Sequence, residues 1–184
     1  MMRRIWKPLV FVSLVGILVL AVYLQVSSLE RPPVGTGIGE LAPDFTGTTL
    51  EGDTVTLSDF HGQIVLVNDF ATWCGPCQAE TPYLVEVYNS ENGDLAIIGL
   101  NLQEDEEKVA DFKEQHGIPY PLVMDPDGEI SELYRLVGLP TSWFIDSEGV
   151  VRYVHAGPMT TAMLQETLDA IREGREPDVF SVLN

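Results

Sequence analysis

After residue 41, hydrophobic residues fall either into short continuous runs or at positions spaced three to four apart. Two nearly continuous runs, Ile64–Phe70 and Leu95–Leu102, predict strands that are covered on both faces of a sheet. Spaced hydrophobic positions predict helices over residues 75–89, 104–115, 130–136 and 160–172. Shorter runs predict strands over residues 122–124, 142–145 and 150–155. Because strands alternate with helices, we predict an α/β fold with a mixed central sheet flanked by helices.

Turn residues complete this pattern near both ends of the domain. Residues 45–57 have stretches of alternating character around Glu51-Gly52-Asp53, which predicts a short N-terminal hairpin. Ser147-Glu148-Gly149 predicts a second tight turn between the last two strands. The sequence has no internal repeat and no low-complexity segment. We therefore interpret residues 41–174 as one domain and residues 175–184 as a C-terminal tail.

The start of the chain has a different character. Residues 9–26 carry no charge, and the segment just reaches the length that a helix needs to cross a bilayer. Three basic residues precede it, Arg3, Arg4 and Lys7, and such positive flanks stay in the cytoplasm. We expect a single membrane-spanning helix, with residues 1–8 in the cytoplasm and the later residues outside the cell membrane. A cleaved signal peptide is the alternative; residues 26–28 match a cleavage site poorly, and both interpretations export the domain.

Residues 27–40 are rich in proline and glycine, which suits a linker between anchor and domain. All 28 acidic residues lie after position 29, together with seven of the ten basic ones, so the exported part has a net charge of about −21. Such a negative surface would repel nucleic acid and anionic lipid. We interpret it as a solubilising surface rather than as an acidic docking patch.

The two cysteines of the chain carry its clearest chemical signal. Cys74 and Cys77 stand in the run Cys-Gly-Pro-Cys, directly after a buried strand and at the start of a predicted helix. At a helix N-terminus, unpaired N–H groups and the positive end of the helix dipole stabilise a thiolate. We predict that Cys74 is the exposed nucleophile and that Cys77 resolves the mixed disulfide formed there. Gly75 leaves the approach to Cys74 open, and Pro76 helps to hold the two sulfurs close.

Two other interpretations of the cysteines fit the spacing less well. A structural disulfide normally joins residues far apart in sequence, because closing so short a loop restricts the unfolded chain little. A zinc site needs two further ligands, but there is no second cysteine pair, and His61, His116 and His155 are isolated in the sequence. We therefore predict no metal and no cofactor, since dithiol-disulfide exchange requires none.

Residues 67–77 read VNDFATWCGPC, and Glu80 and Pro82 follow them. This run resembles the thioredoxin superfamily, in particular its membrane-anchored TlpA/ResA/CcmG-type branch. Residues 42–45 (APDF), 137–141 (VGLPT) and 145–149 (IDSEG) match the same branch, in the same order along the chain. The resemblance covers about residues 40–173 and implies a thioredoxin-like fold.

The resemblance also implies roles for residues around the cysteines. It implies a cis peptide bond before Pro140, which places the backbone of Leu139 beside the sulfurs, where it can pair with an extended substrate. In that branch an acidic residue at the position of Glu80 tunes the thiols and shuttles protons to the resolving cysteine; the alternative is an ordinary acid of the first helical turn. Trp73 is either a platform for the substrate or a packing residue, and we favour the platform.

Two positions depart from the family's pattern. The family has an aromatic residue where this chain has Asp69, and tryptophan where it has Phe70. Asn68 and Asp69 are adjacent in a predicted central strand, so one polar side chain faces each side of the sheet. A buried carboxylate needs hydrogen-bond partners or a proton. Asp69 is therefore a satisfied structural acid or lies near a solvent-filled gap, which we favour, or it is an additional proton relay.

These observations predict a thiol-disulfide oxidoreductase that reduces protein disulfides and acts as a monomer. The resemblance implies an electron donor in the membrane and a role in cytochrome c maturation, with the cysteines of apocytochrome c as substrate. A thiol peroxidase is one alternative, but residues 69–73 lack the proline of a peroxidatic motif. A non-enzymatic metallochaperone of the same fold is another; it would need one more residue between the cysteines and a histidine such as His155.

Overall fold

The computed structural model describes residues 15–21, 32–91, 93–179 and 181. Residues 15–21 are helical, but most of the predicted membrane segment 9–26 lies outside the described residues. Within the described parts of the chain, no helix has the length and apolar character that crossing a membrane requires. From Pro33 onward the chain forms one compact unit.

In the part of the chain that the structure describes, seven strands form the sheet of this unit. They are β1 (Thr46–Thr49), β2 (Thr54–Thr56), β3 (Ile64–Phe70), β4 (Leu95–Leu102), β5 (Leu122–Asp125), β6 (Thr141–Ile145) and β7 (Val151–Ala156). Their order in the sheet is β2-β1-β5-β4-β3-β6-β7. The central strands β3, β4 and β5 are parallel, and every other pairing is antiparallel. The predicted mixed sheet is confirmed, with both hairpins in place.

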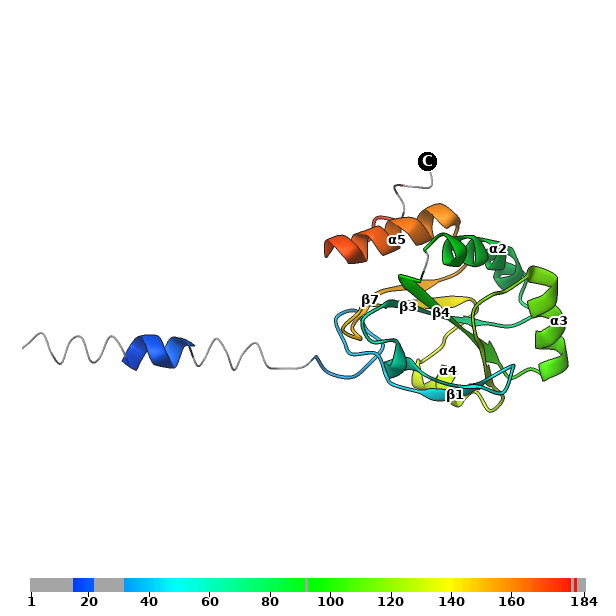
Figure 1. The fold of residues 1–184 in the computed structure, drawn as a ribbon, viewed down its shortest axis with the longest axis horizontal. Coiled ribbons are helices and arrows are strands. Elements are labelled where there is room, and N and C mark those ends of the chain that lie inside the picture. The colour runs from blue at the N-terminus through cyan, green and yellow to red at the C-terminus, as the bar shows by residue number, and fades with distance from the viewer. Residues whose placement is uncertain (1–14, 22–31, 92, 180, 182–184) are drawn as a thin grey trace, which may run out of the picture. The chain divides into compact units, whose positions relative to one another are not determined.

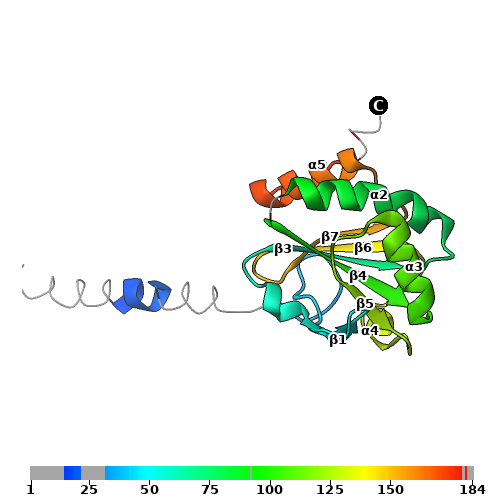
Figure 2. The same ribbon diagram turned by 45° about the vertical axis from the view of Figure 1, so that its right-hand side comes forward.

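Helices cover both faces of the sheet (Figure 2). They are α2 (Gly75–Ser90), α3 (Glu106–His116), α4 (Glu129–Leu133), α5 (Thr161–Glu173) and the short 3-10 helix η2 (Leu57–Phe60). One hydrophobic core joins the sheet to α2, α3 and α5, and a second core lies on the face of α4 and η2. The fold is the predicted α/β sandwich, and β3 at its centre has one core on each side.

Every helix differs from its predicted bounds at one end at least, and α3 and α4 differ by more than one residue, each for a local reason. Helix α3 begins at Glu106 rather than at residue 104, because the Glu104 carboxylate accepts hydrogen bonds from Thr72 in the loop before the cysteines. Helix α4 ends at Leu133 rather than at residue 136, and Arg135 adopts a φ of 54°. The chain thus turns away from α4 earlier than the hydrophobic pattern indicates.

The folded unit extends beyond residues 41–174 at its N-terminal side. Residues assigned to the linker hydrogen-bond to the domain: Gly39 N donates to Val151 O at 2.8 Å, and Val151 N donates to Glu40 O at 2.9 Å. Leu41 forms a bridge to Val150. The last part of the predicted linker is therefore held at the start of β7.

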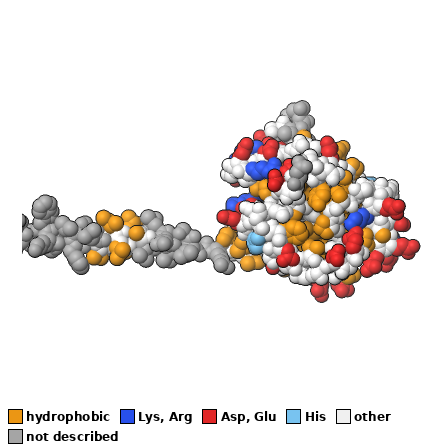
Figure 3. All heavy atoms as spheres, viewed as in Figure 1, with side chains coloured by type: hydrophobic (Ala, Val, Ile, Leu, Met, Phe, Trp, Pro, Cys, Tyr) orange, Lys and Arg blue, Asp and Glu red, His pale blue; other side chains and the backbone are white. Residues whose placement is uncertain are grey.

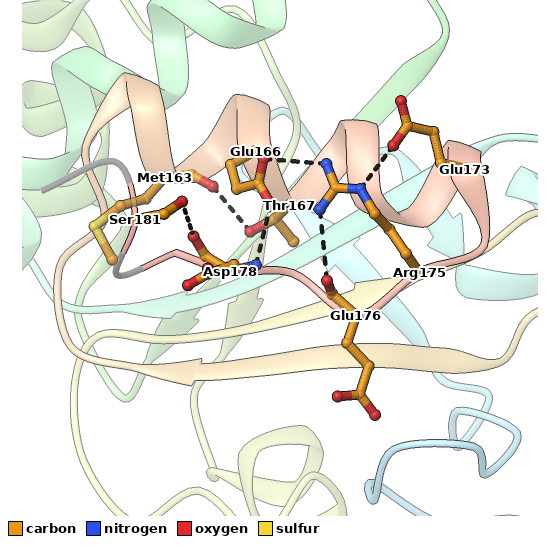
Figure 4. A network of polar contacts seen from close by, with 8 residues as sticks. All are labelled: Met163, Glu166, Thr167, Glu173, Arg175, Glu176, Asp178 and Ser181. Carbon is orange, nitrogen blue, oxygen red and sulfur yellow. Dashed lines mark hydrogen bonds and ion pairs between the residues drawn. The ribbon is translucent and has the colours of Figure 1, made fainter.

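The C-terminal side also extends further than predicted. Figure 4 shows Arg175, which follows α5, between Glu166 on that helix and Glu173 at its end. Asp178 N donates to Glu166 Oε1 at 3.0 Å, and Val179 is 1% exposed in the core on that face. The first residues of the predicted tail thus pack onto α5. Acidic side chains are spread over the visible face of the domain (Figure 3), as the composition predicts.

Candidate active site

The two cysteines form a disulfide at the N-terminus of α2, with their Cα atoms 5.2 Å apart. Strand β3 delivers the chain to this point, and Cys74 caps the helix: its Sγ accepts a hydrogen bond from Cys77 N at 3.2 Å. The same N–H would stabilise a thiolate on Cys74 after reduction, together with the helix dipole. Cys74 is 5% exposed and Cys77 2%. The nucleophile is therefore less exposed in the disulfide form than we predicted.

A groove provides access to Cys74. Trp73, Cys74, Gly75 and Pro76 form one wall, and Leu102 with residues 136–139 form the rest. The groove is markedly apolar, and Trp73 and Val137 on its rim are 70% and 90% exposed. Exposed apolar side chains around a reactive group are typical of a surface that binds another protein. All but one of the residues predicted to contact substrate thus lie together in this groove.

The remaining predicted substrate residue, Pro140, lies behind the groove. It is buried, the peptide bond between Leu139 and Pro140 is cis, and Pro140 O accepts a hydrogen bond from Gly157 N at 2.9 Å. That bond joins the groove wall to the end of β7. Leu139 and Cys74 line the same groove, as the resemblance implies.

Glu80 lies one helical turn after Cys77 on the buried face of α2 and is fully buried. Its Oε1 accepts a hydrogen bond from Met159 N at 2.9 Å, and its Oε2 accepts one from Asn68 Nδ2 at 3.2 Å. Asn68 also donates to Ser142 Oγ at 3.0 Å. Burial raises the pKa of Glu80 to about 7, against these two hydrogen bonds, which lower it. This carboxyl can therefore gain or lose a proton near neutral pH.

Asp69 lies on the opposite face of β3 and is also fully buried. Its Oδ1 is 3.1 Å from Ser131 Oγ, which is 2.8 Å from Asp125 Oδ2. Asp69 Oδ2 has no hydrogen-bond partner. Burial raises the pKa of Asp69 to about 7; the Ser131 hydrogen bond lowers it, and the charge of Asp125 raises it. Adjacent polar residues of β3 thus face opposite sides of the sheet, as predicted.

A third polar group fixes the loop before Cys74. Glu104 accepts hydrogen bonds from Thr72 N at 2.7 Å, from Thr72 Oγ1 at 2.6 Å and from Asn101 Nδ2 at 2.8 Å. Gln78 Nε2 donates to Thr72 O at 2.6 Å from the first part of α2. The end of β4 therefore holds the backbone directly before the reactive cysteine.

Sequence reasoning missed Glu104, Asn101, Ser131 and Asp125 as parts of these networks. Glu104 resembled the acidic start of a helix, and the other three carried no signal. The contacts that tie these networks to the site, Glu104 to Thr72 and Ser131 to Asp69, span 32 and 62 residues of sequence. Among the residues with described positions, no group of three or more histidine, cysteine, aspartate or glutamate side chains is placed to hold a metal ion.

Comparison with known proteins agrees with this geometry. The model of the AhpC/TSA family matches residues 38–154. The chain is 35% identical to the thiol-disulfide oxidoreductase ResA of Bacillus cereus, over 92% of this chain and 96% of that protein. It is 31% identical to the thioredoxin-like protein YneN of Bacillus subtilis, over 92% and 99% of the two chains.

A solved structure gives the same result. The crystal structure of a thiol:disulfide interchange protein of the thioredoxin family from Chlorobium tepidum superposes with a TM-score of 0.64 at 30% identity. The superposition covers 76% of this chain and 96% of that one. The fold, the cysteine pair and the similarity to these relatives thus indicate the same family and the same chemistry.

Proposed function

Since the chain belongs to the AhpC/TSA family and is a thiol-disulfide oxidoreductase with a thioredoxin-like fold, we propose that it acts as a reductant of protein disulfides. The observation that carries the proposal is the Cys74–Cys77 pair at the N-terminus of α2, open to an apolar groove. Its relatives are named thiol-disulfide oxidoreductases, which favours this function over thiol peroxidase or metallochaperone activity.

The reaction is a two-electron exchange between sulfurs. In the reduced protein, the Cys74 thiolate attacks one sulfur of the partner's disulfide, that bond breaks, and the second partner sulfur leaves as a thiolate. The Cys77 thiolate then attacks Cys74 Sγ, which reforms the Cys74–Cys77 disulfide and releases the partner as a dithiol. No cofactor takes part. A further thiol donor must reduce the protein before the next cycle.

Glu80 supplies the proton transfer in this scheme. It shares the buried face of α2 with Cys77, and its raised pKa matches a group that accepts the Cys77 proton at neutral pH. Cys77 must lose that proton before it can attack the mixed disulfide. Glu80 is thus the general base of the resolving step.

The groove accepts an extended peptide segment of the partner. Trp73 offers a flat apolar surface beside Cys74, and Gly75 and Pro76 leave the approach to the sulfur open. Leu139 lines the other wall, and the resemblance implies that its backbone pairs with an extended substrate. The resemblance to the TlpA/ResA/CcmG-type branch supports the cysteines of apocytochrome c as substrate, in cytochrome c maturation. It also supports residues 9–26 as a membrane anchor, an extracytoplasmic domain and a membrane protein as electron donor.

An equilibrium redox titration tests the proposal. The full chain is equilibrated with glutathione and dithiothreitol buffers, with Cys74→Ser and Cys77→Ser as controls. We expect a reversible two-electron transition below about −220 mV, on the reducing side of the known range. A transition near about −120 mV would indicate an oxidant of folding proteins. No reversible transition would refute the oxidoreductase function.

The substrate is tested separately with a peptide that carries the disulfide of a Cys-x-x-Cys-His haem-attachment motif. We expect the reduced protein to reduce this peptide faster than a scrambled peptide in which the same two cysteines form the disulfide. Equal rates would leave a general protein-disulfide reductase and remove apocytochrome c as the preferred substrate.

A further inference from the structure

One buried hydroxyl group, that of Ser131, lies between the carboxyl groups of Asp69 and Asp125. Ser131 Oγ lies within hydrogen-bond distance of a carboxyl oxygen of Asp69 and of one of Asp125. All three side chains are at least nine-tenths buried. A hydroxyl group has one hydrogen to donate, so it cannot form a full hydrogen bond to two carboxylates at once.

The shorter contact decides where the hydroxyl hydrogen lies. Asp125 Oδ2 is 2.8 Å from Ser131 Oγ, against 3.1 Å for Asp69 Oδ1. Asp125 also accepts from Ser131 N at 2.9 Å and from Ile130 N at 3.2 Å, so the backbone of α4 already favours negative charge on it. With the Ser131 hydrogen directed at Asp125, Asp69 can complete its contact only as a donor.

We propose that Asp69 is held as a neutral carboxylic acid that donates a hydrogen bond to Ser131 Oγ, and that this proton positions the wall of the substrate groove through α4. The family resemblance does not supply this role, because the family has an aromatic residue at this position. Asp69 is a positioning residue, since it does not contact the reacting sulfurs.

Among the described residues around Asp69, one charged side chain acts on its carboxyl group. Its neighbours across the sheet are Leu100 on β4 and Thr141 on β6, neither of which carries a charge. The acidic residues of α4, Glu129 and Glu132, are exposed. The charge that faces Asp69 is that of Asp125 at the end of β5.

Ser131 connects this proton to the groove. Its side chain meets Asp69, while its backbone oxygen accepts a hydrogen bond from Leu136 N at 2.9 Å. Leu136 is the first residue of the groove wall that continues through residues 137–139. Tyr134 anchors the same segment from another side, because its hydroxyl donates to Pro43 O at 2.9 Å. The path from Asp69 to the groove thus has two hydrogen bonds.

Loss of the Asp69 proton would turn its favourable contact with Ser131 into an unfavourable one. Above about pH 7, Asp69 ionises, and two buried carboxylates then compete for the Ser131 hydrogen. The bond that holds α4 to β3 weakens, and the groove wall at Leu136 becomes less well fixed. Binding of a protein substrate should therefore weaken as the pH rises through this range.

Infrared spectroscopy tests the proton directly. The full chain carrying Glu80→Gln is compared with the Glu80→Gln/Asp69→Asn variant at about pH 6. Both proteins lack Glu80, so this second buried acid makes no contribution to the spectrum. We expect the carbonyl stretch of a protonated, water-shielded carboxylic acid in the first protein and its loss in the second. A spectrum unchanged by Asp69→Asn would overturn the proposal.

A rate ratio tests the effect on the groove. The reduced full chain reacts either with insulin, whose disulfides must enter the groove, or with 2-hydroxyethyl disulfide, which is too small to need it. The ratio of the two second-order rate constants cancels changes in thiolate content. For the wild type we expect this ratio to fall about fivefold between about pH 6 and pH 8, the size expected for losing one buried hydrogen bond.

Two variants separate positioning from mere stability. Asp69→Asn keeps a donor toward Ser131 and carries no ionisable proton, so its ratio should not change with pH. Ser131→Ala removes the acceptor, so its ratio should be low at both pH values. An equal fall with pH in wild type and Asp69→Asn would overturn the positioning role. This inference rests on the proposed function for its substrate site, but the infrared result needs no substrate and fails or succeeds on its own.

Discussion

The two faces of β3 each bury one carboxyl group, and the comparison between them shows how partners decide what a buried acid can do. On the α2 face, Glu80 accepts hydrogen bonds from Met159 N and Asn68 Nδ2, which cannot ionise at neutral pH. On the α4 face, Asp69 shares a hydroxyl with a second carboxylate. The first acid is supplied with donors for its charged form, whereas the second is not. We therefore assign proton transfer during turnover to Glu80, and to Asp69 a proton that positions the groove wall and is lost above about pH 7.

The largest difference between the faces should appear in turnover. Glu80→Gln removes the proposed base of the resolving step and should slow insulin reduction about 100-fold, as expected for general acid–base catalysis. Asp69→Asn should leave turnover at about pH 6 nearly unchanged, because it replaces one neutral donor by another. Steady-state rates measured side by side decide this. A large loss in Asp69→Asn at that pH would remove the distinction between the two acids.

The pH dependence of stability should show both acids. Their pKa values are raised to about 7 in the folded protein from 4.5 for Glu80 and 3.8 for Asp69, so the unfolded chain binds fewer protons between about pH 4 and 7. Each acid therefore lowers stability as pH rises in that window, by up to about tenfold in the folding equilibrium per pH unit, and adds no slope above it.

Urea unfolding across that pH range measures this effect. Each single variant, Glu80→Gln or Asp69→Asn, should remove the contribution of one proton from the slope of the unfolding free energy against pH. The double variant should remove both contributions, because the two sites lie on opposite faces of β3 and share no partner. Slopes that match the wild type in either single variant would show that the acid concerned is ionised in the folded protein.

A smaller difference should follow from removing the neutral partners. Asn68→Ala breaks two buried hydrogen bonds and leaves an oxygen of Glu80 unpaired, so it should destabilise the protein by about 2 kcal/mol. Ser131→Ala breaks contacts of one hydroxyl, while Asp125 keeps its two backbone donors, and should cost about 1 kcal/mol. Chemical denaturation at about pH 6 measures both. The reverse order would mean that the α4 face carries the tighter network.

The smallest effect is expected at Glu166, a partly buried carboxylate near the surface, which serves as a reference for the two fully buried acids. The side-chain hydrogen bond from Arg175 lowers the pKa of Glu166 to about 2 from 4.5. The stability that this pair contributes is present above about pH 4.5 and is lost as pH falls toward 2. Glu166→Gln should therefore lower the thermal midpoint slightly at neutral pH, less in high salt, and not at all near pH 2. Asp169→Asn, in a looser ion pair with Arg172, is the control.

The sequence predicted the elements of the fold well because continuous and spaced hydrophobic runs follow directly from burial. Ile64–Phe70 and Leu95–Leu102 were predicted with the bounds that the structure has. The Cys-Gly-Pro-Cys run likewise placed Cys74 at a helix N-terminus from local spacing alone.

The polar networks around the site could not be predicted in the same way. Glu104 lies 32 residues from Thr72, and Ser131 lies 62 residues from Asp69, so no local pattern connects them. The adjacent Asn68 and Asp69 did indicate that each face of β3 receives one polar group. Their partners are set by tertiary packing, and only the folded chain brings them together.

Gly39 and Glu40 join the domain at the start of β7, which lies at the same end of the sheet as the first residues of β3, with β6 between the two strands. Cys74 lies beyond the opposite end of β3, four residues after Phe70. At ~3.3 Å per residue, β3 spans about 20 Å between these two ends of the sheet. For a chain held in place on its N-terminal side, the sheet itself acts as a spacer. The sulfurs then operate at the far end of that spacer, and a partner can approach them without first passing the point of attachment.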